Sequence, residues 1–296
     1  MNVQQTITPE LRAWIVAQAQ AGCQPADVLN AMRASGWDEQ VAMAALEDTL
    51  EAHLGRPAVE ALQQRLAPGA VAAQLAQPQR LPEPALEAGA TMLQLPDRKV
   101  EVLAQMALPR VVVLGGFLSH EECDALVALA NPRLSRSETV VNATGGSEVN
   151  SARTSDGMFF GRGEHALCAR IEQRIADLLR WPVINGEGLQ VLRYRPGAQY
   201  LPHHDYFDPA QPGAPTILSR GGQRLGTLLM YLNTPERGGS TTFPDVGLEV
   251  APIKGNAVFF SYSRPSPATR TLHGGAPVLA GEKWVATKWL REGEFH

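Results

Sequence analysis

Residues 200–206 read Tyr-Leu-Pro-His-His-Asp-Tyr and combine two histidines and an aspartate in one short stretch. Successive side chains of a β-strand point to opposite faces, so a strand here places His203 and Asp205 on one face and His204 on the other. Two potential metal ligands then point toward the same space. The alternative to a pair of metal ligands is a His–Asp pair on the protein surface, which has the same sequence pattern.

A third potential ligand lies in the sequence Thr-Leu-His-Gly-Gly at residues 271–275. Iron sites with two His and one carboxylate use three protein ligands and leave the other positions open, whereas a structural zinc site is closed by four. We therefore predict His203, Asp205 and His273 as metal ligands. A zinc hydrolase is disfavoured, because no general-base carboxylate accompanies the ligands at a recognisable spacing.

Residues 283–289, Lys-Trp-Val-Ala-Thr-Lys-Trp, follow ten residues later. Alternation places Lys283, Val285, Thr287 and Trp289 on one face of a strand. An ammonium directed into an apolar interior needs an anion, because burying an unpaired charge is very costly. The second carboxylate of a metal-bound dicarboxylate would meet that need. The alternative is a Lys at a strand start that reaches solvent.

Composition restricts the class of protein. The 296 residues are 44% hydrophobic and 19% charged, which suits one enzyme-sized domain plus a smaller unit. The formal net charge of −4 argues against nucleic acid as a partner. We also expect no membrane partner, because there is neither a signal-like start nor an apolar run of about 18 residues. Three scattered cysteines without a CxxC pair favour a cytoplasmic location.

Residues 1–55 have the start and stop signals of three short helices, which predict a small three-helix bundle. Thr8 can cap the first helix and Gly22 can end it, Pro25 can open the second and Gly36 can end it, and Asp38 can cap the third. The unit resembles small helical domains of the ubiquitin-associated type, and a protein partner is one role for it.

Residues 56–98 are predicted to be a linker. The stretch 57–96 contains ten Ala, six Gln and six Pro, and the prolines forbid one continuous helix.

Residues 99–296 are predicted to form an α+β domain with a double-stranded β-helix, or jelly roll. Strand-like runs at 100–103 and 110–114 precede two helices, one opened by the Ser119–Glu122 capping box and one at about 163–179. These two helices are expected to buttress one sheet. Short strands are predicted at 189–194, 199–206, 225–232, 240–243, 257–262, 270–273 and 284–290. Alternation predicts an apolar interior of Leu192, Leu228, Val258, Phe260 and Val285.

Residues 140–160 form a candidate lid. The Asn-Ala-Thr-Gly-Gly-Ser sequence at 142–147 is typical of a flexible hairpin tip, and strand-like residues flank it. The alternative is an ordinary hairpin in which Arg153 pairs with a surface carboxylate.

From about Lys99 to Arg291, the sequence resembles the iron(II)/2-oxoglutarate dioxygenases of the prolyl 4-hydroxylase type. The motifs that carry this resemblance are 187–194 (EGLQVLRY), 202–207 (PHHDYF), 221–224 (GGQR), 229–233 (LMYLN), 238–241 (GGST) and 273–289. One position departs from the pattern, because Arg291 stands where the collagen-type enzymes have a His.

The resemblance implies roles for individual residues. His203, Asp205 and His273 would bind iron, and Lys283 would pair with the distal carboxylate of 2-oxoglutarate. Further positions are implied as 2-oxoglutarate contacts (Tyr194, Thr241), as catalytic residues (Glu187, Arg224) and as peptide contacts (Arg153, Ser155, Trp289). Glu187 and Arg224 could equally form a structural ion pair.

The implied activity is hydroxylation of a prolyl residue in a peptide or protein, with Fe(II), 2-oxoglutarate and O2 as cofactors and ascorbate as a candidate reductant. 2-Oxoglutarate would leave as succinate and CO2. One alternative is a dioxygenase that acts on a free amino acid or another residue type. Another is a helical partner-binding module on a degenerate barrel.

Overall fold

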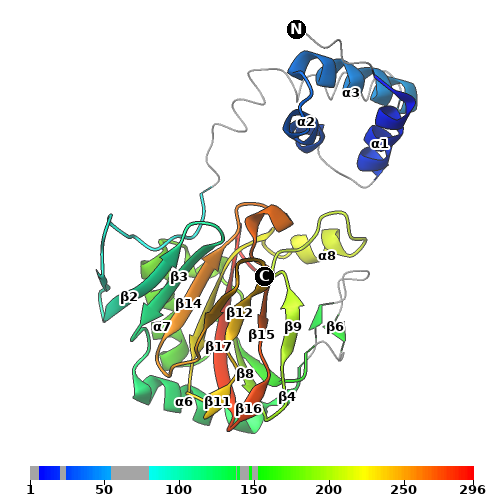
Figure 1. Ribbon diagram of the computed structural model, residues 1–296. Helices are drawn as coiled ribbons and strands as arrows, with labels where there is room; N and C mark the ends of the chain where they lie inside the picture. The colour runs from blue at the N-terminus through cyan, green and yellow to red at the C-terminus, as the bar shows by residue number, and fades with distance from the viewer. Residues whose placement is uncertain (1–6, 21–24, 55–79, 138, 141–146, 149–152) are drawn as a thin grey trace. The chain divides into compact units, whose positions relative to one another are not determined.

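The polypeptide folds as two units, residues 1–79 and residues 80–296, each described by itself (Figure 1). The computed structural model describes residues 7–20, 25–54, 80–137, 139–140, 147–148 and 153–296. No helix among these residues has both the length and the apolar character needed to span a lipid bilayer.

The smaller unit contains the three predicted helices, α1 (Pro9–Gln20), α2 (Pro25–Ala34) and α3 (Glu39–Leu54). Two of the predicted caps are present. The amide of Leu11 donates to Thr8 Oγ1 over 3.3 Å, and that of Val41 donates to Asp38 Oδ1 over 3.3 Å. The helices share a buried core of Ile15, Val28, Leu29, Met32, Ala42, Ala45 and Leu46, against which Trp37 packs.

The larger unit begins earlier than predicted, because residues 80–98 belong to it and not to a linker. Strand β1 (Met92–Gln94) pairs with β2 (Lys99–Met106) in a hairpin, and Leu93 and Leu95 are buried in the main core. The prolines in this stretch suggested a linker, but β1 forms a short edge strand, and Leu93 within it and Leu95 after it are buried. The predicted linker residues 56–79 lie outside the described residues.

A nine-stranded antiparallel sheet is the base of the larger unit. Its strands, in spatial order, are β1, β2, β3 (Arg110–Gly115), β14 (Ala257–Ser261), β10 (Arg224–Tyr231), β17 (Lys283–Arg291), β8 (Leu189–Tyr194), β7 (Asp156–Phe160) and β4 (Ser135–Arg136).

A four-stranded antiparallel sheet packs against one face of this base (Figure 1). Its order is β13 (Leu248–Val250), β12 (Thr241–Phe243), β15 (His273–Gly275) and β9 (Tyr200–His203). Phe243 and Val250 from this sheet share a core cluster with Tyr231, Val258 and Phe260 of the base. Two antiparallel sheets packed face to face form the predicted jelly roll.

Shorter elements connect these sheets. They are the strand pairs β11 (Arg237–Gly238) with β16 (Val278–Ala280) and β5 (Thr139–Val140) with β6 (Ser147–Glu148), helix α8 (Ala214–Leu218), and the 3-10 turns η1 (Asn131–Arg133), η2 (Val183–Asn185), η3 (Pro244–Val246) and η4 (Pro267–Thr269). Turn η4 ends directly before the stretch in which we predicted a strand at 270–273. Arg270 ends it with a φ of 53°, so β15 starts only at His273.

Helices α6 (His120–Ala130) and α7 (Ala166–Leu179) cover the other face of the nine-stranded sheet, as predicted. The predicted capping box is present, because Ser119 Oγ accepts from the amide of Glu122 and the Glu122 carboxylate accepts from the amide of Ser119. Apolar residues of both helices pack on the sheet in the main core. The cavity described below lies on the opposite face of the base.

Alternation along β10 and β17 decides which side chains face the second sheet. Thr227 and Leu229 face the second sheet, whereas Leu228 packs in the main core on the side of the helices. The prediction that Leu228 lines the interior between the two sheets was therefore wrong. On β17, Lys283 and Trp289 face the second sheet, and Trp284 packs toward the helices.

A buried ion pair joins β17 to α7. Lys288 Nζ bonds to Glu172 Oε1, and Glu172 Oε2 accepts from the amide of Gly163 over 2.8 Å. Lys288→Met should lower the free energy of unfolding by about 3–5 kcal/mol, because it leaves the Glu172 charge buried without its partner. Urea denaturation measures this loss. The double variant Lys288→Met/Glu172→Gln should recover at least half of it, and equal losses for both variants would contradict the explanation.

Candidate metal centre and active site

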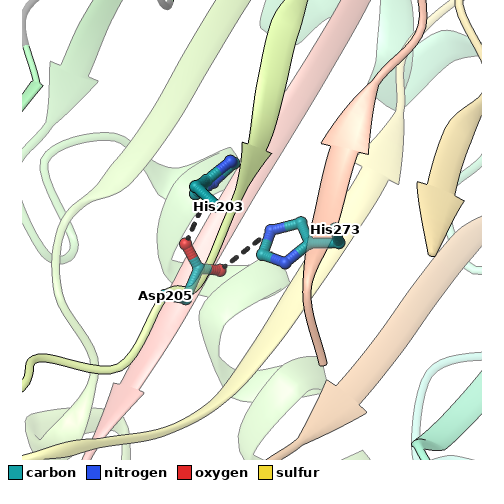
Figure 2. A group of neighbouring side chains, drawn as sticks. All are labelled: His203, Asp205 and His273. Carbon is teal, nitrogen blue, oxygen red and sulfur yellow. Dashed lines mark ion pairs between the residues drawn. The ribbon is translucent and has the colours of Figure 1, made fainter. Parts of the chain in front are cut away.

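The pairing of β9 with β15 brings two histidines together that are 70 positions apart. His203 lies opposite His273 in this pairing, and Asp205 follows two residues after His203. His203 Nε2 is 3.5 Å from Asp205 Oδ1, and His273 Nε2 is 3.5 Å from Asp205 Oδ2 (Figure 2). Among the residues that the structure describes, this is the one group of three or more His, Cys, Asp or Glu side chains whose ligand atoms lie close enough together to hold a metal ion.

The orientation of both imidazoles fits a metal site. His203 Nδ1 lies 3.0 Å from the carbonyl oxygen of Leu201, and His273 Nδ1 lies 3.0 Å from that of Thr271. A carbonyl only accepts, so each Nδ1 carries the proton and each Nε2 presents its lone pair to the centre. Tyr200 stacks on His203 with ring centroids 3.7 Å apart, which further fixes that ring.

The charge states also fit a divalent cation. Burial lowers the pKa of His273 to about 4, so its imidazole is neutral at neutral pH. Burial opposes ionisation of Asp205, but the imidazoles of His273 and His203 and the guanidinium of Arg224 hold the pKa of its carboxyl well below its usual range. Two imidazoles and one carboxylate are a donor set that iron(II) accepts.

The three side chains open into a cavity between the two sheets. Its walls contain the predicted residues Lys283, Tyr194, Thr241, Arg153 and Trp289, with Tyr200, Thr227, Leu192, Leu229, Val285 and Thr287. The structure therefore places the predicted metal ligands, the predicted 2-oxoglutarate contacts and two predicted peptide contacts around one space.

Lys283 is the unusual charge of this cavity. It is buried, and no carboxylate among the described residues pairs with it. Its Nζ lies 5.6 Å from the ring centroid of Tyr194 and 5.8 Å from that of Tyr231. Burial lowers the pKa of Lys283 to about 7. Gly239 lies against its stem, because a Cβ at this position would be 3.1 Å from Lys283 Cδ.

Glu187 and Arg224 lie behind the cavity wall, as the structural ion pair that we weighed. Arg224 donates to Glu187 over 2.6 and 2.9 Å, and neither residue lines the cavity. The guanidinium carbon of Arg224 lies 4.0 Å from the centroid of the Trp289 ring, which does line it. The Glu187–Arg224 pair therefore supports the indole of Trp289 from behind the cavity wall.

The segment predicted as a lid is described only in part. Arg153 lines the cavity and donates to Gln190 Oε1 over 2.8 Å. Ser155 is fully buried and donates to Ser137 Oγ over 2.9 Å, away from the cavity, so the structure does not place it as a peptide contact. Strands β5 and β6 form the flanking hairpin pair. The tip, 141–146, and residues 149–152 lie outside the described residues.

Sequence reasoning missed three residues of the site. Tyr231 donates to Thr241 Oγ1 over 2.8 Å, and Thr227 donates to the metal-ligand candidate Asp205 over 2.7 Å. Tyr262 lies 3.1 Å from the Thr227 hydroxyl. Alternation along β10 could have placed Thr227 and Tyr231 on the face of the cavity, but nothing local marks their hydroxyls.

Comparison with known proteins agrees with this geometry. Residues 189–291 match the family described as the 2OG-Fe(II) oxygenase superfamily. Prolyl 4-hydroxylase 1 of Arabidopsis thaliana is 43% identical over 225 residues, which cover 69% of this chain and 75% of that protein. Probable prolyl 4-hydroxylase 3 of the same plant is 41% identical over 220 residues, which cover 67% and 74%.

The chain therefore belongs to the prolyl 4-hydroxylase family of 2OG-Fe(II) oxygenases, and the predicted family is confirmed. Its cofactors are Fe(II), 2-oxoglutarate and O2. Among solved structures, the viral collagen prolyl hydroxylase of Paramecium bursaria Chlorella virus-1 in complex with 2OG is 33% identical. That match covers 61% of this chain and 95% of the viral chain, with a TM-score of 0.47.

The pKa of Lys283 predicts how 2-oxoglutarate binding depends on pH. With a pKa of about 7 in the empty site, Lys283 is an ammonium below that pH and neutral above it. A distal carboxylate that pairs with Lys283 as predicted needs the ammonium, so binding at higher pH must take up a proton. The dissociation constant of 2-oxoglutarate should rise by up to about tenfold per pH unit above neutrality. Anaerobic calorimetry on the Mn(II)-loaded protein measures it.

Lys283→Arg is the matched control for this titration. A guanidinium stays charged throughout the range, so this variant should bind 2-oxoglutarate with little dependence on pH, although more weakly. A wild-type protein with an equally flat profile would show that Lys283 does not pair with the cosubstrate.

Proposed function

We propose that this protein hydroxylates prolyl residues in a peptide or protein substrate and converts 2-oxoglutarate and O2 into succinate and CO2 in the same reaction. The observation that carries the proposal is the arrangement of one cavity. Two imidazoles and a carboxylate lie on one side of it, the buried ammonium of Lys283 lies on another, and Trp289 and Tyr200 form an aromatic wall.

Each group has a separate task in this reaction. His203, Asp205 and His273 hold the metal from one side, which leaves its other side open to small molecules. When bound, iron(II) supplies the oxygen-activating chemistry: one atom of O2 enters the C–H bond of the substrate and the other enters succinate as 2-oxoglutarate loses CO2. Lys283 binds the distal carboxylate and thereby orients the cosubstrate.

The remaining wall residues orient the substrate and exclude water. Leu192, Leu229 and Val285 give the cavity an apolar lining, which keeps water from the reacting groups. Trp289 and Tyr200 present flat faces of the kind on which a proline ring packs. The names of the relatives, which are prolyl 4-hydroxylases, favour a polypeptide over a free amino acid as the substrate.

Hydroxylation should be visible as a product and as a coupled reaction. Incubation with Fe(II), 2-oxoglutarate and a proline-rich peptide should add the mass of one oxygen atom to the peptide and release succinate in equal amount. Mass spectrometry and a succinate assay measure the two products. His203→Ala should lower both by more than about 100-fold, because it removes a metal ligand. Succinate release that the peptide does not stimulate, but free proline does, would favour the amino acid enzyme.

The helices α1–α3 have a second proposed role, as a module that binds the protein carrying the target proline. Two observations support it: the helices enclose a core of their own, and α1 exposes the large side chain of Trp14. A tethered module raises the effective concentration of its partner at the active site.

Truncation tests this role, and the boundary at Arg80 shows where to cut. Removal of residues 1–79 should leave kcat/KM for a short peptide within about twofold, while kcat/KM for the whole protein partner falls by about tenfold or more. Kinetics on peptide and protein substrates compare the two. Equal losses on both would mean that the helices support the fold of the larger unit.

The proposal also includes ascorbate as an external reductant and the cytoplasm as the compartment. Cys123 and Cys168 are free and buried, which is the state of cysteines in a reducing compartment.

A further inference from the structure

A buried hydroxyl lies directly behind the carboxylate of the metal site. Thr227, on β10, has its Oγ1 2.7 Å from Asp205 Oδ2 and 3.1 Å from the hydroxyl oxygen of Tyr262, which follows the neighbouring strand β14. Thr227 and Tyr262 are each 1% exposed, and Asp205 is 6% exposed. All three polar groups therefore depend on one another for hydrogen bonds.

The chemistry of the three groups fixes the direction of both hydrogen bonds. An ionised carboxylate can only accept, so the Thr227 hydroxyl must donate its one proton to Asp205. Because the one hydroxyl proton of Thr227 is already donated to Asp205, its oxygen can only accept a hydrogen bond from Tyr262. The Tyr262 hydroxyl must therefore be the donor. Burial and the nearby Asp205 charge raise the pKa of Tyr262 well above its ordinary value, which keeps that proton in place.

Asp205 needs such a contact because the torsion that sets the plane of an aspartate carboxylate is broad. Oδ1 is 3.5 Å from His203 Nε2, and Oδ2 is 3.5 Å from His273 Nε2. Without a further bond, the plane of the carboxylate would vary, and so would the direction in which its oxygens face the centre. The hydroxyl of Thr227 engages Oδ2 and leaves the lone pairs of Oδ1 free.

We propose that Thr227, oriented by Tyr262, is a positioning residue for the metal centre, because it holds the Asp205 carboxylate in one orientation with Oδ1 available to the ion. The inference rests on the proposed function in that it takes His203, Asp205 and His273 as the iron ligands. It assigns Tyr262 and Thr227 a role as a two-step hydrogen-bond relay from the core of the base sheet to the metal.

Metal binding without turnover tests the relay. Mn(II) alone is titrated into the full-length protein in the absence of 2-oxoglutarate and peptide, and free Mn(II) is followed by electron paramagnetic resonance. Thr227→Val keeps the shape of the side chain and removes the hydroxyl, and it should weaken Mn(II) binding by about 10–100-fold. Thr227→Ser restores the hydroxyl and should bind within about threefold of the wild type.

Tyr262→Phe tests the second step. It should weaken Mn(II) binding by less than about tenfold, because Thr227 still donates to Asp205 but loses its own donor. In the Thr227→Val background, the same change should have no further effect on Mn(II) affinity. Tyr231→Phe is the matched control, because the Tyr231 hydroxyl donates to Thr241 and not toward a metal ligand. Its Mn(II) affinity should equal that of the wild type.

The outcomes separate the relay from the site itself. His203→Ala must lose Mn(II) binding, and a wild-type protein that binds no Mn(II) would overturn the proposed function together with the relay. If the wild type binds and His203→Ala does not, equal affinities for Thr227→Val and the wild type would overturn the relay alone. So would an equal loss in Thr227→Ser and Thr227→Val, because the hydroxyl that Thr227→Ser keeps would then fail to preserve Mn(II) binding. Thermal unfolding of each variant confirms that it is folded.

Discussion

A carboxylate held ionised between two β-sheets is the constraint on which this site depends. Asp205 is almost completely buried, and a buried charge is stable only with compensating partners. Within the protein, the hydroxyl of Thr227 donates to the Asp205 carboxylate, and the nearby guanidinium of Arg224 favours its ionised form. Because Asp205 follows β9 of the second sheet and both partners stand on β10 of the base, these contacts form only when the two sheets are in place. The metal site therefore depends on the packing of the two sheets against each other.

The two lysines of β17 show how the same fold treats buried cations in opposite ways. Lys288 faces the helices and bonds to Glu172, so its charge is neutralised within the protein. Lys283, five positions earlier, faces the cavity, where its ammonium lies near the rings of Tyr194 and Tyr231 and pairs with no carboxylate among the described residues. The odd spacing puts the two side chains on opposite faces of the strand. Lys288 therefore stabilises the fold, whereas the charge of Lys283 is available to bind an anionic ligand, as proposed above.

Sequence reasoning reached the parts of the site that depend on local periodicity. The two-residue repeat was enough to place Lys283 and Trp289 on one face of a strand, and the His-x-Asp spacing gave two ligands. The pairing of β9 with β15 is a long-range contact that local periodicity does not give, and His273 was predicted from the composition of two-His-one-carboxylate iron sites and from the family resemblance. Thr227 and Tyr262 were missed because a threonine and a tyrosine in a core strand look like ordinary packing residues. Ser155 was assigned to the peptide by resemblance, but its hydroxyl points to Ser137 in the interior.

The start of the larger unit was placed too late for a related reason. Proline and alanine in residues 80–98 suggested a linker, but a strand needs only three residues to pair at the edge of a sheet. The burial of Leu93 and Leu95 in the main core decides that this segment belongs to the larger unit, and the residues they contact there lie far along the chain. Composition describes what a free segment prefers, and tertiary contacts override it.

Arg291 takes the position at which the resemblance led us to expect a His, and its contacts explain what the exchange does. Its guanidinium donates to Glu187 Oε1 over 2.7 Å and to the carbonyl oxygen of Gly222 over 2.7 Å. A neutral imidazole has only one N–H and could make one of these bonds, so a His would join both groups only when protonated. Glu187 in turn holds Arg224, on which the indole of Trp289 lies. With an arginine at position 291, the chain of contacts from the Gly222 loop to the cavity wall stays connected across the pH range in which a histidine would titrate.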